Sequence, residues 1–543
     1  MSTDRLSADR SHRWWQHGVI YQVYARSFAD ADGDGVGDLA GIASRLEYPA
    51  WLGVDAIWIT PFFPSPMVDG GYDVADYTGV HDGLGSLEDF DRMLAAAHGR
   101  GLRVILDLVP NHTSDRHPWF IESRSSRDNP RRDWYLWRDP APDGGPPNNW
   151  ISEFGGPAWT LDPATGQFYY HAFASAQPDL NWRNPSVRRA MYDVMRFWLD
   201  RGVDGFRVDV LWHLVKDAEW RDNPTNPDYV EGRDSPSRRL VQTYSADQPG
   251  VHDIVAEMRA VVDEYGDERV LIGEIYLPVE RLVTYYGREG RGAHLPFNFH
   301  LILAPWEARR LEEVIAAYEG ALPPDAWPNW VLGNHDLPRV ASRIGDAQAR
   351  VAAVLLLTLR GTPTLYYGEE LGLRDVELPP GLVQDVRGTN QPGRGLSRDP
   401  VRTPMPWDST PGGGFTAGNP WLPLGNRNLA HSVAAQRDDP GSMLTLYRRL
   451  LELRRAERAL AVGSYRPVPA LDGVLAYRRQ HAHRELLVAL NLEAEPGGLR
   501  LPEGFESGRV LLSATGAGEG EVRRGQLDLP ADEALILEPI PGA

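Results

Sequence analysis

The chain has 543 residues, a formal net charge of −19 and no cysteine. The negative charge argues against nucleic acid or an anionic membrane surface as a partner, because both require a positive protein surface. A small neutral ligand fits this charge better, and monomer and homo-oligomer are both compatible with the sequence. The lack of cysteine excludes disulfides, thiolate chemistry and cysteine zinc sites.

Two features favour a cytoplasmic protein with no membrane segment. The N-terminal segment 1–15 is polar and lacks the apolar core of a signal peptide. The longest apolar run, Val351–Leu359, is about half as long as a membrane span must be.

Strand-like and helix-like segments alternate along most of the chain. Eight short apolar runs predict strands, at Val19–Val23, Ala56–Thr60, Val104–Val109, Gly205–Val210, Val270–Ile275, Phe297–Ile302, Trp330–Leu332 and Thr364–Tyr367. Helical periodicity lies between most of them, at Leu87–Gly99, Val187–Arg201, Val251–Tyr265 and Gln348–Leu359. This order predicts an α/β fold, a (β/α)8 barrel, in residues 1–109 and 178–461.

Three segments depart from this alternation. Residues 110–177 are rich in Pro, Gly, Asn, Trp and Arg without a long amphipathic helix, which predicts a subdomain inserted after the third strand and lying over the active site. Residues 381–428 follow the eighth strand, and we expect them to form an active-site loop. After a helix near Ser442–Ala456, short apolar runs separated by Gly and Pro predict an all-β, sandwich-like C-terminal domain in residues 462–543.

Three short motifs end predicted strands, and each carries a carboxylate. They are GFRVD ending at Asp209, GEIY containing Glu274, and GNHD ending at Asp336. Parallel strands of a barrel bring their carboxyl ends to one face, so these acids should meet around one pocket. Two carboxylates can cleave a glycosidic bond, and a third can stabilise the developing charge. One such acid alone more often belongs to a structural ion pair, so it is the set of three that predicts a glycosidase.

The neighbours of these acids suggest different roles for them. Arg207 lies two residues before Asp209 and should keep that carboxylate ionised, as a nucleophile requires. An apolar setting would raise the pKa of Glu274 and suit it to act as the general acid. His335, beside Asp336, is a donor for a sugar hydroxyl.

Together with DLVPNH at 107–112, these segments resemble the four motifs of the α-amylase superfamily, glycoside hydrolase family 13, across essentially the whole chain. The resemblance implies that Asp209 is the nucleophile, Glu274 the acid/base and Asp336 the transition-state stabiliser. It implies no organic cofactor. It also implies that three further residues surround the sugar being cleaved: His112, Arg207 and His335.

Shorter motifs resemble the oligo-1,6-glucosidase and α-glucosidase group of this family. GYD at 71–73 is similar to the clamp for the non-reducing end, which implies that Tyr72 stacks on the glucose and that Asp73 binds its far hydroxyls with Arg402. An arginine–carboxylate pair across the pocket floor would block longer chains, which predicts exo-action. QPDLN at 177–181 resembles a signature of the same group. The remaining pocket residues implied are Gln177, Phe154 and Phe173, the last two of which fit the core equally well.

Val210 and Leu337 bear on linkage and acceptor. In this group, Val after the nucleophile accompanies α-1,6 cleavage, whereas Ala or Thr accompanies α-1,4 cleavage. Leu337 departs from relatives that carry Gln there, which leaves the acceptor preference open.

We therefore expect an exo-acting, retaining α-glucosidase that releases α-glucose from short α-glucosides and favours α-1,6 linkages. A trehalose-forming isomerase or a glucosyltransferase would use the same site and is the main alternative. A non-catalytic family member is less compatible with three intact acids and no membrane span.

An acidic, glycine-rich loop, DADGDGVGD at 30–38, follows the first predicted strand. Carboxylates at alternate positions offer the oxygen ligands that a hard cation requires. The loop is similar to the start of an EF-hand, but the twelfth position is Gly41 rather than a glutamate and no helix pair flanks it. A similar loop in oligo-1,6-glucosidases implies a structural Ca²⁺, with Mg²⁺ as the alternative, held by Asp30, Asp32, Asp34, the Val36 carbonyl and Asp38.

Overall fold

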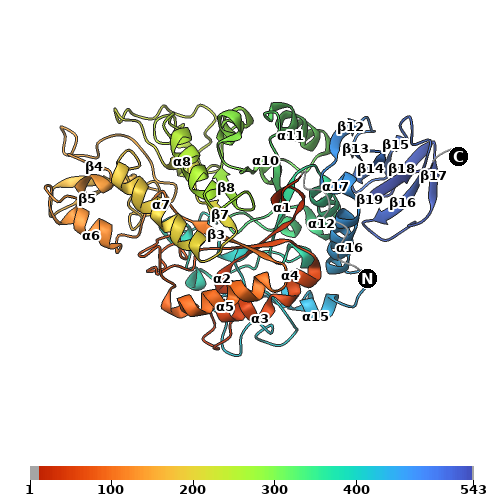
Figure 1. The fold of residues 1–543 in the computed structure, drawn as a ribbon, viewed down its shortest axis with the longest axis horizontal. Coiled ribbons are helices and arrows are strands. Elements are labelled where there is room, and N and C mark those ends of the chain that lie inside the picture. Colours follow the sequence, from red (N-terminus) through yellow and green to blue (C-terminus); the bar gives the residue numbers. More distant parts are fainter. Residues whose placement is uncertain (1–11, 541–543) are drawn as a thin grey trace.

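The computed structural model describes residues 12–540, so most of the polar N-terminal segment, residues 1–11, lies outside the described part. Its centre is an eight-stranded parallel sheet in the order β10-β11-β1-β2-β3-β7-β8-β9 (Figure 1). The two outer strands of this order, β9 and β10, lie side by side, so the sheet curls into a near-closed barrel. The predicted (β/α)8 barrel is confirmed. Its strands are β1 (Ile20–Val23), β2 (Ala56–Ile59), β3 (Arg103–Leu108), β7 (Gly205–Val208), β8 (Val270–Ile275), β9 (Leu295–Asn298), β10 (Asn329–Val331) and β11 (Thr362–Tyr366).

Helices cover the outside of the barrel, and their sequences explain where they begin and which face they bury. In α5, Ser86 and Asp89 form a reciprocal capping box before the first turn. The same helix buries Phe90, Met93, Leu94 and Ala97, which share one face at helical spacing. The longer helices are α5 (Leu87–His98), α7 (Pro185–Asp200), α8 (Val251–Asp263), α11 (Ala308–Ala321), α12 (Val340–Thr358) and α16 (Met443–Ala456).

One predicted strand, Phe297–Ile302, is placed differently in the structure. Strand β9 ends at Asn298, and a short helix, α10 (His300–Leu303), follows. The Asn298 side chain accepts a hydrogen bond from the backbone N–H of His300 (2.9 Å) and turns the chain out of the sheet. This short segment therefore contains both a strand end and the start of a helix, which its residue pattern cannot separate.

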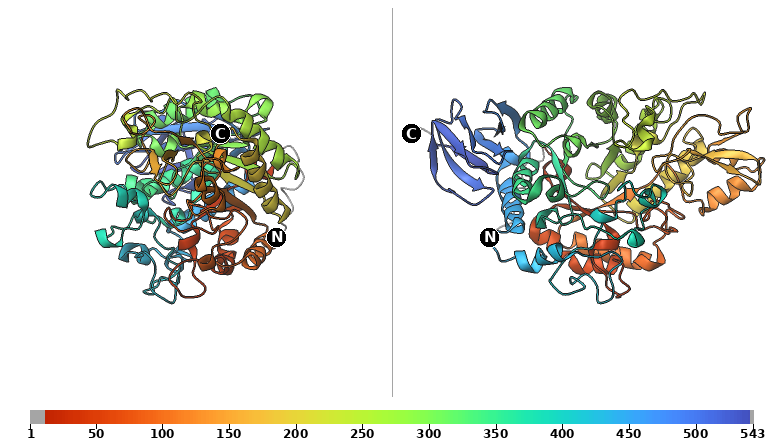
Figure 2. Two further views of the ribbon diagram at one scale, coloured as in Figure 1. Left: turned by 90° about the vertical axis from the view of Figure 1, so that its left-hand side faces the viewer. Right: turned by 180° about the vertical axis from the view of Figure 1, so that it is seen from behind.

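The predicted insertion and the predicted C-terminal β region lie at opposite ends of the molecule (Figures 1 and 2). Segment 110–177 contains α6 (Pro118–Ser125) and a three-stranded sheet of β4 (Trp137–Arg138), β6 (Gln167–Tyr170) and β5 (Trp159–Asp162). The exact limits of these domains stay predictions.

The C-terminal strands form an antiparallel sheet in the order β12-β13-β14-β19-β16-β17 and a β15-β18 pair, with an apolar core that both contribute to. They are β12 (Ser464–Val468), β13 (Val474–His481), β14 (Arg484–Asn491), β15 (Gly497–Arg500), β16 (Ser507–Ser513), β17 (Val522–Arg524), β18 (Gln526–Leu529) and β19 (Ala534–Pro539). No helix within residues 12–540 combines the length and the apolar character of a membrane span.

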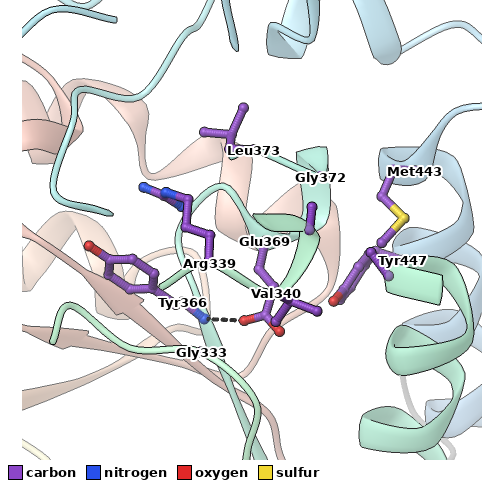
Figure 3. Close-up of a pocket in the computed structure, with 11 residues that line it drawn as sticks. Gly333, Arg339, Val340, Tyr366, Glu369, Gly372, Leu373, Met443 and Tyr447 are labelled. Atoms are coloured by element: carbon purple, nitrogen blue, oxygen red, sulfur yellow. Dashed lines mark hydrogen bonds between the residues drawn. The ribbon is translucent and has the colours of Figure 1, made fainter. Parts of the chain in front are cut away.

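A small buried cavity of about 10 Å³ lies between α12, α16 and the ends of β10 and β11 (Figure 3). The Glu369 carboxylate faces it and accepts a hydrogen bond from the backbone N–H of Tyr366 (3.0 Å). A Cβ on Gly333 would lie 3.1 Å from the same carboxylate, so the start of the GNHD motif packs directly against Glu369.

Candidate active site

Arg207 holds together three carboxylates at the ends of neighbouring strands. Its buried guanidinium donates through Nη1 to Asp107 and to Asp209, each at 2.8 Å. Its Nη2 lies 2.7 Å from Oε2 of Glu274. The indole of Trp58 lies 4.9 Å from the same guanidinium, a cation–π contact. One arginine of β7 therefore fixes an acid on β3, an acid on β8 and the acid directly after β7.

Two glycines allow these strands to pack closely enough for this arrangement. A Cβ on Gly205 would lie 2.1 Å from the carbonyl oxygen of Val270 on β8. A Cβ on Gly273 would lie 2.4 Å from the side chain of Leu211, in the turn after β7. At Gly205 the close atom belongs to the backbone, so only glycine fits there, whereas at Gly273 a larger residue would force the Leu211 side chain to move.

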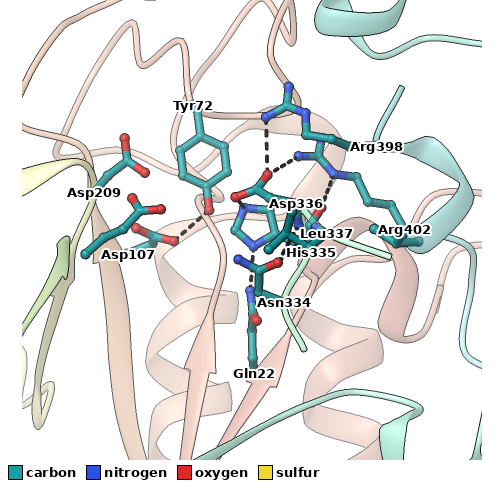
Figure 4. A network of polar contacts seen from close by, with 12 residues as sticks. Gln22, Tyr72, Asp107, Asp209, Asn334, His335, Asp336, Leu337, Arg398 and Arg402 are labelled. Carbon is teal, nitrogen blue, oxygen red and sulfur yellow. Dashed lines mark hydrogen bonds and ion pairs between the residues drawn. The ribbon is translucent and has the colours of Figure 1, made fainter. Parts of the chain in front are cut away.

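Asp336 forms the opposite side of the pocket and faces two arginines (Figure 4). Its carboxylate accepts hydrogen bonds from Arg402 (3.0 Å) and Arg398 (3.3 Å), and Nε2 of His335 lies 3.5 Å away. The side chain of Asn334 accepts a hydrogen bond from the backbone N–H of Asp336 (3.0 Å) and fixes the turn. The GNHD motif thus holds the Asp336 carboxylate in a fixed position beside two arginines.

Tyr72 joins the two sides of the pocket. Its hydroxyl donates to Asp107 (2.8 Å), and its ring stacks on His335 with 5.3 Å between the ring centroids and a 5° interplanar angle. Nδ1 of His335 lies 2.7 Å from the side-chain amide of Gln22 on β1. Tyr72 therefore presents an ordered aromatic wall between the acids.

The expected pair of Asp73 and Arg402 does not form. Asp73 is fully buried, and its carboxylate accepts two backbone N–H groups of its own loop (2.9 and 3.0 Å). Instead Asp69, four residues earlier, forms an ion pair, and its partner is Arg398 rather than Arg402. Both glycines between the two aspartates have positive φ (59° and 107°), so the chain turns sharply between them.

Arg398, rather than Arg402, is the centre of this ionic cluster. It contacts Asp69, Asp385 and Asp336, while Arg402 contacts Asp336 and the carbonyl of His335 (2.9 Å). Sequence reasoning missed Asp69, Asp385 and Arg398. The signal in the sequence that could have pointed to this cluster is Arg398 itself, a second arginine four residues before Arg402.

The inserted segment contributes the remaining wall. The side-chain amide of Gln177 donates to Asp69 (3.0 Å) and lies 3.1 Å from Nε2 of His112. The ring of Phe173 lies 5.3 Å from His112 and 5.5 Å from Phe154. The Arg398 guanidinium also contacts Phe154 and lies 4.9 Å from the centre of its ring. The structure therefore brings Gln177, Phe154 and Phe173 to the pocket that the strand ends form.

The acids of the pocket have different proton affinities. Burial raises the pKa of Asp209 well above its usual range, and the attraction of Arg207 does not offset this, contrary to our expectation. Burial also raises the pKa of Glu274, although Arg207 and a backbone N–H act in the opposite direction. Because their charges repel, these neighbouring groups titrate as a pair that can hold one proton.

Asp336 is the opposite case. Burial alone would raise its pKa, but the positive charges of Arg398 and Arg402 hold it well below the usual range. Burial lowers the pKa of His335 to about 3 and that of His112 to about 4, so both imidazoles are neutral at pH 7. The site thus combines a proton-sharing pair with a permanently charged carboxylate.

The acidic loop after β1 brings three of its four expected carboxylate ligands together. Carboxylate oxygens of Asp30, Asp32 and Asp38 lie within 4.8 Å of one another. The Asp34 carboxylate lies outside this cluster and accepts the backbone N–H of Val36 (2.7 Å). The three clustered carboxylates are the hard oxygen donors that Ca²⁺ takes, so this part of the loop fits the ion.

Comparison with known proteins agrees with this geometry. The α-amylase catalytic domain family matches residues 22–463. The chain belongs to the α-amylase family. A probable α-glucosidase of Rhizobium meliloti is 44% identical, over 92% of each chain. An oligo-1,6-glucosidase of Halalkalibacterium halodurans is 38% identical, over 89% of this chain and 91% of the relative.

A solved structure of an α-glucosyl transfer enzyme superposes on this α-amylase family chain with a TM-score of 0.92. It is 41% identical and covers 97% of this chain and 100% of its own. The resemblance drawn from the motifs is confirmed, and the chain is a glycoside hydrolase related to α-glucosidases.

Proposed function

We propose that this enzyme is an exo-acting, retaining α-glucosidase for short α-glucosides, with a preference for α-1,6 linkages. The observation that carries the proposal is the shared contact of Asp209 and Glu274 with one guanidinium. Retaining enzymes keep their two carboxyl groups about 5–5.5 Å apart, whereas inverting enzymes need about 6.5–9.5 Å to admit a water. Two acids that bind the same arginine side by side fit the shorter separation.

In the proposed reaction, Asp209 attacks the anomeric carbon while Glu274 gives its proton to the leaving oxygen. Water then gives a proton back to Glu274 and attacks the glucosyl–Asp209 ester, so α-glucose leaves and both acids return to their starting state. Asp336, held as a carboxylate by the arginines, would stabilise the positive charge that develops on the sugar.

Exo-action is supported by the ionic cluster that lies across the pocket. Asp69, Arg398 and Asp385 are linked to one another, and Arg398 and Arg402 both contact Asp336. A glucose at the non-reducing end would meet charged hydrogen-bonding groups there, and a longer chain would have to break them. Asp69 and Arg398 would therefore bind the far hydroxyls of that glucose.

The linkage preference rests on Val210 and on the oligo-1,6-glucosidase relative.

Glucosyl transfer is the second candidate, favoured by the similarity to a solved α-glucosyl transfer enzyme. Transfer and hydrolysis differ only in whether a sugar or water reaches the covalent intermediate.

The test is glucose release from isomaltose, maltose, trehalose and sucrose, with Asp209→Asn as the inactive control. The proposal predicts fastest cleavage of isomaltose and no turnover by the variant. Faster cleavage of maltose or trehalose would refute the linkage preference but keep the site. A new disaccharide without free glucose would make transfer the main reaction.

For the loop after β1, we propose a structural Ca²⁺ held by Asp30, Asp32 and Asp38. Support comes from their convergence and from the short contact of Asp30 with Thr416, which ties this loop to a distant segment of the chain. The ion would neutralise the clustered carboxylates and so stabilise this junction.

A further inference from the structure

Val210, directly after Asp209, has an unusual backbone conformation. Its φ is 38° and its ψ is 48°, in the left-handed region that a β-branched residue rarely adopts. Hydrogen bonds on both sides hold the turn, from Asp209 N–H to Leu108 (2.8 Å) and from His213 N–H to the Val210 carbonyl (2.9 Å). A strained residue that its surroundings fix in this way points to a function of the backbone at that position.

The conformation directs the Val210 N–H at Glu274. The N–H donates to Oε2 of that carboxylate at 2.9 Å, and Nη2 of Arg207 lies 2.7 Å from the same oxygen. A carboxyl oxygen has two lone pairs, so these two donors occupy the acceptor sites of Oε2. A proton on Oε2 would point at an N–H group and be repelled.

We infer that Val210 is a positioning residue, whose backbone N–H acts with Arg207 to keep Oε2 of Glu274 an acceptor and to leave Oε1 as the oxygen that carries the catalytic proton. This inference rests on the proposed role of Glu274 as the acid/base. In the first step the O–H bond at Oε1 breaks and its proton goes to the glycosidic oxygen. That oxygen keeps the electron pair of the broken C–O bond, Asp209 forms the new bond to the anomeric carbon, and Glu274 is left as a carboxylate.

The N–H has a measurable effect because it binds the charged form of Glu274 more strongly than the neutral form. The ionisable groups that face Glu274 are Asp107 on β3, Arg207 and Asp209 at β7, Tyr276 after β8 and Asp336 after β10. Removing the N–H leaves all of them in place. The pKa of Glu274 then rises, so the alkaline limb of kcat/KM, where the acid loses its proton, moves to higher pH.

The test replaces the Val210 amide by an ester, using the α-hydroxy acid that matches valine, which deletes the N–H and keeps the side chain. Isomaltose is the substrate, because its sugar leaving group needs acid assistance. We expect the alkaline limb of kcat/KM to move up by about one pH unit, the size typical of a hydrogen bond to a charged group.

Two controls separate the N–H from other effects. The same ester at Leu211 removes an amide proton from the same turn and leaves both Glu274 contacts intact, so the limb should stay in place. Val210→Gly keeps the N–H and adopts a positive φ at little cost. The alkaline limb of kcat/KM for this variant should therefore also stay at the same pH, even if the value of kcat/KM changes. An unmoved limb in the Val210 ester, or an equal shift in either control, would overturn the inference.

Failure of the proposed function would look different. Glu274→Gln should lose isomaltose cleavage but still release fluoride from α-glucosyl fluoride, a substrate that needs no acid. If Glu274→Gln cleaves isomaltose like the unmodified enzyme, the acid/base role itself is wrong.

Discussion

Asp69 and Asp73 are four residues apart and both buried, but their partners differ. Asp69 binds the arginine that faces the pocket, whereas Asp73 accepts hydrogen bonds from backbone N–H groups of its own loop. The identity of a side chain therefore says less about its role than the turn in which it lies. In this loop two glycines with positive φ lie between the two aspartates and set which carboxylate faces Arg398.

This difference makes a matched pair of substitutions informative. Asp69→Asn should lower kcat/KM for isomaltose by about 10- to 100-fold, because a charged hydrogen bond to the terminal glucose and to Arg398 is lost. Asp73→Asn should lower the thermal midpoint and affect kcat/KM much less. Steady-state kinetics and calorimetry on both variants check this, and the reverse pattern would restore Asp73 as the substrate ligand.

Glu369, in the small cavity behind the GNHD motif, should make stability depend on pH. Burial raises its pKa to about 7, despite the N–H of Tyr366 and the charge of Arg343. The folded chain thus holds this proton more tightly than the unfolded chain, so stability falls as the pH rises from about 4.5 to about 7. The loss is on the order of 3 kcal/mol.

Glu369→Gln removes this titration and nearly preserves shape. Relative to the unmodified protein, the variant should gain stability as the pH rises from about 4.5 to about 7, and the difference should level off above that pH. Thermal midpoints at several pH values measure this, with exposed Glu312→Gln as the control. Parallel pH profiles for Glu369→Gln and the unmodified protein would contradict the assignment.

At the scale of the elements, the loop after β1 should depend on its cation. A chelator should lower the thermal midpoint by a few degrees and Ca²⁺ should restore it, because an ion at 100 times its Kd adds about 2.7 kcal/mol. Asp32→Asn should abolish this response. Asp34→Asn should keep most of it, because the Asp34 carboxylate lies outside the cluster. A midpoint that responds to neither chelator nor Ca²⁺ would refute the proposal.

Most elements of the barrel could be predicted, because each strand is a short apolar run and each flanking helix has a clear apolar face. The three acids could be predicted as one site because parallel strand ends meet at one face. Two other features could not. The Phe297–Ile302 run contains both a strand end and a helix, and the Asp69–Arg398 pair joins residues far apart through loops without periodicity. The proton affinity of Asp209 also depends on burial, which only the packed structure reveals.

For the whole molecule, two buried arginines meet the end of α12, and one of them, Arg479 on β13, connects the barrel to the C-terminal strands. Arg454 donates to Leu357 (3.0 Å), and Arg479 donates to Thr358 and to Gly463 (2.8 Å), so both hold carbonyls at the end of α12. Cations suit a helix C-terminus, and these two replace the hydrogen bonds that its last carbonyls lack.

Arg479→Met should therefore loosen this junction. The expected cost is about 3 kcal/mol, because several buried carbonyls lose their donor. Calorimetry should show a lower midpoint, and limited proteolysis should cut faster near residue 463. Arg466→Met, an exposed arginine of β12, is the control. Equal stability of the two variants would show that Arg479 does not join these parts.

The central claim is a double displacement through Asp209, and the anomer of the first product tests it most directly. Proton NMR during the first seconds of isomaltose cleavage distinguishes newly released α-glucose from β-glucose before the two interconvert. The account predicts that α-glucose is released first, since two inversions at the anomeric carbon restore its configuration. Initial release of β-glucose would mean a single displacement by water and would contradict the assignment of Asp209 as the nucleophile.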